Sequence, residues 1–278
     1  MELLVFSGVV FAISAVAGFL GALTGLGGGV VITPLLTILL GVDLHYAIGA
    51  TLVSVIATSS GAAAGYVREG FSNIRAGMFL EIATTLGAVA GAHLTTVLPG
   101  SALAMIFGAV LLYSAWHSLR KQKPHEPSSP DALADRLRLQ GTYPGPEGRV
   151  SYTVSHVKAG FSLMFVAGLL SGLLGIGSGA MKVIAMDQVM RIPFKVSTTT
   201  SNFMIGVTAA ASAGLYLGRG YIDPGLAMPV MLGVLAGSML GARQLAGAKT
   251  RILRLIFAVV VGVLAIEMIY SGSTGGIR

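Results

Sequence analysis

The chain contains no cysteine, and only 10% of its 278 residues are charged. Without cysteine it can form no disulfide, no thiolate metal site and no thiol nucleophile. The low charge is atypical of a soluble domain, in which about 25% of residues are charged. Hydrophobic residues make up 54% of the chain, and its mean hydropathy is +0.82. Several apolar runs reach the roughly 20 residues that a helix needs to cross a bilayer, so the composition predicts a polytopic membrane protein.

Three other absences narrow the class of protein. Residues 1–20 contain neither a basic segment nor a small-residue cleavage site, so we interpret them as a first membrane helix and not as a signal peptide. The net charge of +7 lies mostly in loops, which the positive-inside rule explains without nucleic acid as a partner. No HExxH motif occurs. A GxSxG motif is also absent at Ser178, because the residues two positions before and after it are not glycines. Enzyme activity, a cofactor and a metal site are therefore not expected.

The chain does contain one motif twice. VAGFLGALTGLGGG runs from Val16 to Gly29, and VAGLLSGLLGIGSG runs from Val166 to Gly179, an offset of 150 positions. The offset continues without gaps well beyond the motif, since Phe107 falls on Phe257. Two copies of an apolar unit, each with a glycine cluster at the same place, are typical of a transporter whose site lies between its halves.

We predict an all-α fold with two membrane repeats, residues 1–119 and 156–278, joined by a polar linker at 120–155. The apolar segments of the first repeat are Leu3–Thr24, Gly29–Leu40, His45–Tyr66, Ala76–Val97 and Ala102–Leu119. Those of the second are His156–Leu174, Gly179–Met190, Val196–Leu217, Gly225–Leu245 and Ile252–Tyr270. All should be helical, because lipid offers no water to unpaired backbone groups. The second segment of each repeat is shorter than the roughly 20 residues that a helix needs to span the bilayer. It should therefore form a broken helix or a tight hairpin with the first segment.

The linker is rich in proline, serine and glycine, and we assign no chemistry to it. Within it, Asp131 is expected to cap a short amphipathic helix that contains Leu133, Leu137 and Leu139.

Basic residues predict the side of the membrane on which each loop lies. The linker, rich in arginine and lysine, should be cytoplasmic. Counting from it, the turn Gly41–Leu44 lies outside, whereas its counterpart Arg191–Phe194 lies inside. Corresponding loops on opposite sides indicate inverted repeats, with both termini outside. Arg219, in a turn assigned to the outside, is the exception.

The glycine clusters are the main candidates for a substrate site. Their members are Gly25, Gly27, Gly28 and Gly29 in the first repeat, and Gly175, Gly177 and Gly179 with Ser178 in the second. Each glycine inside a helix costs about 1 kcal/mol relative to alanine, so the clusters should unwind their helices. Freed amides and the positive end of the following helix favour an anion, and the two breaks should converge near the middle of the membrane. The alternative is close helix packing, for which small residues are also suited.

Three of the ionisable residues within the predicted membrane segments are candidates for a functional role. Lys182 lies in the first turn after Gly179, where a cation opposes the helix dipole unless an anion is bound. We interpret it as an electrostatic partner of the substrate, with a snorkelling lysine as the alternative. Asp187 is a candidate for proton coupling, although an ion pair with Arg191 on the same helix face is the simpler interpretation. Glu81 is also a candidate for proton coupling, or else an interfacial residue.

Hydroxyl and amide side chains gather where the third segment of the second repeat begins. Thr200, Ser201 and Asn202 could donate hydrogen bonds to an oxyanion, and Thr51 opens the matching segment of the first repeat. We expect these side chains to line the pathway. Hydroxyl groups in membrane helices also bond back to their own carbonyls, which is the alternative.

These motifs together resemble the TauE/SafE family of sulfite exporters. The resemblance lies in GLGGGVVITPLL from Gly25 to Leu36, AIGATLVSV from Ala47 to Val55, and GIGSGAMKV with STTTSNF in the second half. It implies transport of a small sulfur oxyanion or organosulfonate across the cell inner membrane. We therefore predict a secondary transporter that exports such an anion by alternating access, with the bilayer as its other partner. A passive anion channel is the alternative, and a homo-oligomer is left open.

Overall fold

The computed structural model describes residues 3–24, 29–68, 70–119, 131–145, 148–245 and 250–274, and the chain is predominantly helical, as predicted. In the first half the helices are α1 (Leu3–Thr24), α2 (Gly29–Leu40), α3 (Leu44–Arg68), α4 (Ile74–Leu94) and α5 (Gly100–Leu119). In the second half they are α7 (Val157–Leu174), α8 (Gly179–Ile184), the π-helical turn η1 (Ala185–Val189), α9 (Phe194–Gly218), α10 (Pro224–Leu245) and α11 (Thr250–Ser273). Each predicted apolar segment therefore corresponds to a helix or, in one case, to α8 with η1.

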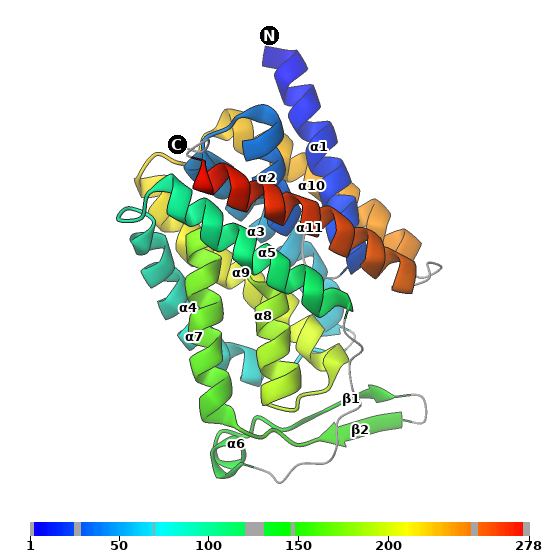
Figure 1. Ribbon diagram of the computed structural model, residues 1–278. Helices are drawn as coiled ribbons and strands as arrows, with labels where there is room; N and C mark the ends of the chain where they lie inside the picture. The colour runs from blue at the N-terminus through cyan, green and yellow to red at the C-terminus, as the bar shows by residue number, and fades with distance from the viewer. Residues whose placement is uncertain are drawn as a thin grey trace.

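Helices of one half pack mainly against helices of the other. α1 packs along α10 and α7 packs along α4, and these two pairs correspond to each other under the repeat offset. The pairs α3–α10 and α9–α4 correspond in the same way, while α5 packs on α11 and α3 on α9. Figure 1 shows that α1 and α7 begin at opposite ends of the bundle, and that α5 and α11 lie side by side. The main contacts between the halves thus come in corresponding pairs.

Isolated glycines allow these helices to approach closely. At several of them an added Cβ would collide with the opposite backbone. Four of these form two pairs that share the repeat offset: Gly18 with Val234 and Gly168 with Thr84, Gly87 with Phe165 and Gly237 with Ala15. Small residues at such crossings let two backbones meet without side chains between them. These glycines serve helix packing.

The predicted break between the first two segments is present in the second half. α7 ends at Leu174 and α8 begins at Gly179. Between them, Gly175 and Gly177 have φ of +68° and Ser178 has φ of +44°, values in the left-handed region that interrupt a right-handed helix. In the first half α1 and α2 are likewise separate helices, but Gly25, Gly27 and Gly28 lie outside the described residues.

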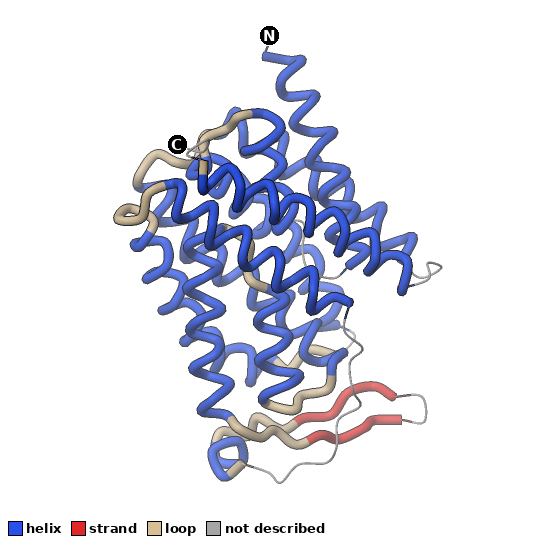
Figure 2. Tube along the Cα trace, viewed as in Figure 1, coloured by secondary structure: helices blue, strands red, loops and turns tan. Residues whose placement is uncertain are grey.

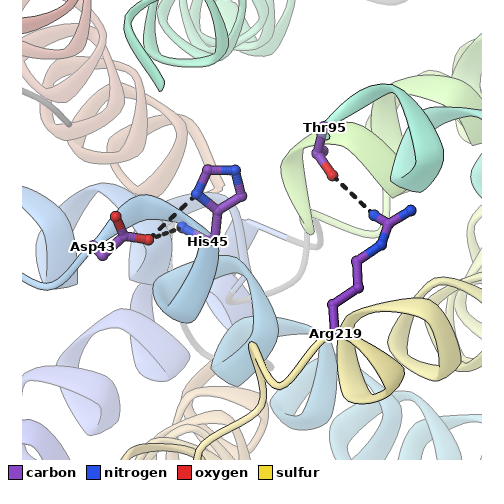
Figure 3. Close-up of polar contacts among 4 residues, drawn as sticks. All are labelled: Asp43, His45, Thr95 and Arg219. Atoms are coloured by element: carbon purple, nitrogen blue, oxygen red, sulfur yellow. Dashed lines mark hydrogen bonds and ion pairs between the residues drawn. The ribbon is translucent and has the colours of Figure 1, made fainter. Parts of the chain in front are cut away.

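Two turns that the charge pattern assigns to the outside lie together at one end of the bundle. The His45 ring, at the start of α3, stacks on the ring of Tyr221, which follows α9, with centroids 5.0 Å apart. The backbone N–H of His45 donates to the Asp43 carboxylate at 2.9 Å, and its ring lies beside the same oxygen (Figure 3). The stack therefore joins the turn before α3 to the turn after α9.

Arg219, the exception to the charge pattern, has a local role at this end. Its guanidinium donates to the carbonyl of Ala92 at 2.5 Å. It also donates to the hydroxyl of Thr95 at 3.4 Å, as Figure 3 shows. Both acceptors lie at the C-terminal end of α4, where the helix dipole favours a cation. The position of Arg219 is thus explained by the helix that it contacts.

The linker contains more structure than its composition indicated. Asp131 caps α6 (Ala132–Arg136), as predicted, by accepting from the N–H of Leu133 at 2.9 Å. Leu137 is the C-terminal cap of α6, and Leu139 lies beyond it, so the predicted helix was too long. The following residues form an antiparallel hairpin of β1 (Gly141–Gly145) and β2 (Gly148–Tyr152), which Figure 2 shows in red at the end opposite both termini. A hairpin was not predicted, because proline and glycine at these positions are also typical of unstructured linkers.

Asn73 fastens this linker to the helical bundle. Its side-chain amide donates to the Leu139 carbonyl and to the Tyr152 hydroxyl, both at 2.7 Å. Its side-chain oxygen Oδ1 accepts from the N–H of Ala76 and so caps α4. Burial raises the pKa of Tyr152 to about 12, with the hydrogen bond from Asn73 opposing the shift. The linker is therefore docked on the bundle by specific polar contacts.

The outer surface of the bundle is apolar in regular stripes. On α4, the side chains of Met78, Ile82 and Leu86 recur every fourth residue and are more than half exposed. By length and composition α4 and α7 are able to cross a membrane, and α2 and parts of α1, α3, α5, α10 and α11 form shorter apolar helices within the described residues. Exposed apolar stripes of this kind are unfavourable in water and suit contact with lipid.

Candidate functional site

A buried polar network joins three helices near the glycine break of the second half. The ammonium group of Lys182, on α8, donates to the Thr208 hydroxyl of α9 at 2.5 Å. Thr208 in turn donates to a carboxylate oxygen of Glu81, on α4, at 2.6 Å. The Thr85 hydroxyl donates to the same oxygen at 3.2 Å. A lysine and a glutamate that are remote in sequence are thus one hydroxyl apart.

Both charged residues of this network are buried. Lys182 is fully buried and Glu81 is 8% exposed. The burial of Lys182 does not fit a snorkelling side chain, and the burial of Glu81 does not fit a side chain exposed at the interface. Taking one charge alone out of water costs several kcal/mol, so a buried lysine requires a compensating anion. Glu81 supplies that charge in this structure.

The start of α2 lies close to the glycine break of the second half. Gly29, the first residue of α2, lies so close to Gly175 that an added Cβ would be 3.6 Å from the Gly175 carbonyl oxygen. A Cβ on Gly177 would meet Val55 of α3 and Ile205 of α9. The described ends of the two breaks therefore share one region between α3 and α9.

Thr51 contributes to this region from α3. Its hydroxyl donates back to the Ala47 carbonyl at 2.8 Å and shares a second hydrogen bond with the Thr33 hydroxyl of α2 at 2.9 Å. The back-bonding alternative thus applies to Thr51, although the side chain also links α2 to α3.

The cluster at the start of α9 is divided among three different contacts. Ser201 donates to the carbonyl of Gly179 at 3.2 Å, which ties α9 to the start of α8. Thr200 accepts from the backbone N–H of Asn73 at 2.9 Å and so faces the linker end of α4. Asn202 is half-buried, and its carbonyl accepts from the Ser59 hydroxyl. Of these, Ser201 lies nearest the break.

Asp187 lies in the π-helical turn η1 and is 4% exposed. The helical segment ends before Arg191, whose φ is +60°. The two residues are therefore not on one face of a common helix, and the spacing that favoured an ion pair does not apply. Single π-helical turns inside α-helices are frequent at functional sites.

Thr208 was not singled out by the sequence reasoning. A signal for it existed, because Ser197, Ser201, Thr208 and Ser212 recur at helical spacing and are all buried on α9. Thr208 lies beyond the STTTSNF motif, which ends at Phe203. Within the described ranges, no three side chains among histidine, cysteine, aspartate and glutamate gather to hold a metal ion.

The charged network has no equivalent in the other repeat. In the first half, Ile32 corresponds to Lys182 and Thr58 to Thr208. In the second half, Met231 corresponds to Glu81. Ile32 is buried, whereas the Thr58 hydroxyl donates to the Ser54 carbonyl of its own helix. The scaffold is repeated, but the buried charges occur once.

Comparisons with known proteins give matches along nearly the whole chain. The family model described as "Sulfite exporter TauE/SafE" matches residues 10–268. The probable membrane transporter protein YunE of Bacillus subtilis (strain 168) is 26% identical over 272 residues, which cover 95% of this chain and 97% of the relative. A probable membrane transporter protein of Xylella fastidiosa (strain 9a5c) is 26% identical over 258 residues, 91% of each chain. No solved structure matches.

Proposed function

Because the chain belongs to the sulfite exporter TauE/SafE family, we propose that this membrane transporter exports a small sulfur-containing anion, sulfite or an organosulfonate, by alternating access. The observation that carries the proposal is the fully buried Lys182 beside the break between α7 and α8. Ionisable residues within membrane segments are costly and are characteristic of substrate and ion pathways. A buried ammonium group is suited to an anion and not to a cation.

The substrate would bind where the two breaks meet, with Lys182 as its cationic partner. Ser201 and Thr51 lie on the helices that border this region, and Asn202 has an amide that no described hydrogen bond uses. We assign the glycine clusters the role of exposing backbone amides to the anion, which includes Gly25, Gly27 and Gly28. Thr200, which accepts from the N–H of Asn73, would lie at the inner end of the pathway. Of the two buried acids among the described residues, Glu81 on α4 and Asp187 in η1, one would carry a coupled proton.

The two halves would act as inverted repeats that rock around this site. Three features support this proposal: the corresponding helix contacts, the opposite directions of α1 and α7 in Figure 1, and the paired glycine crossings. The end that carries the linker would face the cytoplasm, since the linker is rich in arginine and lysine. The end with Arg219 and His45 would then face outward.

A binding screen on purified protein tests the proposal. Sulfite, sulfate and short alkylsulfonates are added separately, and the shift of the melting temperature is measured, because a ligand that binds only the folded state stabilises it. We expect sulfite or a sulfonate to raise the melting temperature of the wild type, and Lys182→Met to abolish the shift. Lys158→Met, which changes an exposed lysine of α7, is the matched control and should keep it.

The Lys182→Met/Glu81→Gln double variant keeps this test informative if the single variant folds poorly. It removes both buried charges and should fold without binding the anion. An undiminished shift in the double variant would remove Lys182 from the site. The absence of any shift in the wild type, for every sulfur anion, would contradict the proposed substrate class.

A further inference from the structure

The Glu81–Thr208–Lys182 network has unused hydrogen-bonding capacity at both ends. An ammonium group has three donors, and among the described residues one bond from Lys182 is made, to Thr208. At the other end, the second carboxylate oxygen of Glu81 is buried without a hydrogen-bond partner among the described residues. Buried polar atoms are seldom left unsatisfied. The lysine can therefore accept an additional oxyanion, and the carboxyl group can accept a proton without losing an existing bond.

Thr208 can respond to either change. Its single hydroxyl proton has two acceptors within reach, the Glu81 carboxylate at 2.6 Å and the Met204 carbonyl at 2.9 Å. With Glu81 ionised, the charged acceptor is favoured, because hydrogen bonds to ionised groups are about twice as strong as neutral ones. With Glu81 protonated, the hydroxyl can bond back to Met204 and still accept from Lys182. Thr208 therefore keeps one donor and one acceptor whether Glu81 is ionised or protonated.

The charge of the site distinguishes these states. With Glu81 ionised and Lys182 protonated, the buried charges sum to zero and an added anion would meet an uncompensated negative charge. With Glu81 protonated, Lys182 is a lone buried cation, which is unfavourable unless an anion joins it. The two favoured states are therefore an empty site with ionised Glu81, and an anion-filled site with protonated Glu81.

We propose that Glu81 is the counter-ion that the transported anion replaces at Lys182, so that each anion bound is accompanied by one proton on the Glu81 carboxyl group. The inference rests on the proposed function and specifies its coupling. The proton comes from solution on the side where the anion enters, forms an O–H bond on Glu81, and returns to solution on the other side. A monovalent anion is then carried without net movement of charge. Thr208 is a positioning residue that transmits the change between the two ends.

The other charged groups on α4, α7 and α9 are exposed or lie at the ends of these helices. α4 packs against α7 and α9, on which Lys158 and Lys195 are exposed, while Arg219 contacts the far end of α4. On α4 itself, Arg75 and His93 lie at the two ends and are exposed. Among the described residues, the other buried acid is Asp187 in η1, which packs against α7, α8 and α9. It is therefore the comparison residue for the test.

The first part of the test measures labelled methanesulfonate and sulfite flux in proteoliposomes. Methanesulfonate is a strong acid and keeps one negative charge across the pH range, so its flux reports protonation of the protein alone. We expect the flux to follow an imposed pH gradient and to be unaffected by a membrane potential at equal pH. Flux that follows the potential and ignores the pH gradient overturns this inference while leaving the proposed function intact. No flux of either probe by the wild type overturns both.

The second part locates the proton. One proton taken up per anion predicts that the apparent dissociation constant rises about tenfold per pH unit above the range in which Glu81 titrates. Glu81→Gln, which imitates the protonated acid, should bind the anion with an affinity independent of pH. It should also melt at a lower temperature without anion and show a larger anion-induced shift than the wild type. Thr208→Val should flatten the pH dependence, and Thr208→Ser should restore it.

Asp187→Asn completes the comparison and should leave the pH profile unchanged. A flat profile in Asp187→Asn together with a wild-type profile in Glu81→Gln would assign the proton to Asp187 and overturn the inference. A wild-type profile in Thr208→Val would remove the threonine from the relay. Because each variant is judged by its pH profile, a purely structural loss of stability does not imitate the expected result.

Discussion

At the scale of single residues, the buried charges of Lys182 and Glu81 each depend on the other for compensation. Both are buried, and one hydroxyl joins them. Removing one partner leaves a lone charge in an apolar interior, whereas removing both leaves neutral side chains that pack there. The pair thus resembles other buried ion pairs, whose members depend strongly on each other and whose net contribution to stability is small.

This dependence gives a stability prediction. In the absence of anion, Lys182→Met should lower the free energy of unfolding by about 3–5 kcal/mol, because Glu81 loses its counter-charge. Adding Glu81→Gln should recover most of that loss. Melting temperatures of the wild type, the two single variants and the double variant measure the coupling. Additive effects would show that the two side chains do not interact.

Asp131 supports a pH prediction outside the membrane segments. Its carboxylate accepts from the N–H groups of Leu133 and Val157, both at 2.9 Å, so it joins α6 to α7. These bonds lower the pKa of Asp131 below its usual 3.8, and the bond from Leu133 contributes most to the shift. A group whose pKa is lower in the folded state stabilises that state above its unfolded pKa, and the contribution is lost as the pH falls through the folded value.

We therefore expect the docked linker to loosen as the pH falls below about 4. Limited proteolysis of the linker with an acid-active protease measures this loosening. Asp131→Asn should be cleaved readily at neutral pH by a neutral protease, and its cleavage should change less on acidification. Equal cleavage of the variant and the wild type at neutral pH would show that the cap does not hold the linker.

At the scale of elements, the contacts between helices depend on glycines that could not be ranked from the sequence. A Cβ on Gly168 of α7 would strike the backbone of Thr84 on α4, whereas one on Gly262 of α11 has nothing within 4 Å. Both are glycines inside apolar helices, and only the packing distinguishes them. A glycine at a close crossing is required by the approach of the opposite backbone.

The two glycines should therefore respond oppositely to alanine. Gly168→Ala should destabilise the protein by about 1–3 kcal/mol, the usual cost of overpacking. Gly262→Ala should be neutral or stabilising by up to about 1 kcal/mol, since alanine favours the helix. Unfolding in detergent by a chemical denaturant measures both. A neutral Gly168→Ala would mean that α4 and α7 can separate at no cost.

At the scale of the whole molecule, hydrophobic runs and glycine clusters predicted most of the architecture. The helices, the break before Gly179 and the capping of α6 by Asp131 follow from local sequence. The bond of Thr208 to Glu81 does not, because it joins residues 127 positions apart and depends on how α4 packs against α9. The hairpin of the linker was missed for a related reason, since its docking depends on Asn73 of a distant turn.

The absence of cysteine makes the proposed orientation testable. Single cysteines can be placed at Ser151 in the linker hairpin and at Thr96 in the turn after α4, both exposed, without any native thiol to remove. In intact cells a membrane-impermeant thiol reagent should label Thr96→Cys and not Ser151→Cys. In inside-out vesicles the pattern should reverse. Labelling of both positions from the same side would contradict an odd number of crossings between them.

The central claim is that two halves rock around one anion site, and counterflow tests it most directly. Proteoliposomes are loaded with unlabelled sulfite and diluted into labelled sulfite. The pH is the same on both sides, and no membrane potential is imposed. Alternating access predicts that labelled sulfite accumulates transiently above its outside concentration, and that Lys182→Met/Glu81→Gln abolishes the accumulation. Equilibration without any overshoot, as through a passive channel, would contradict a transporter with alternating access.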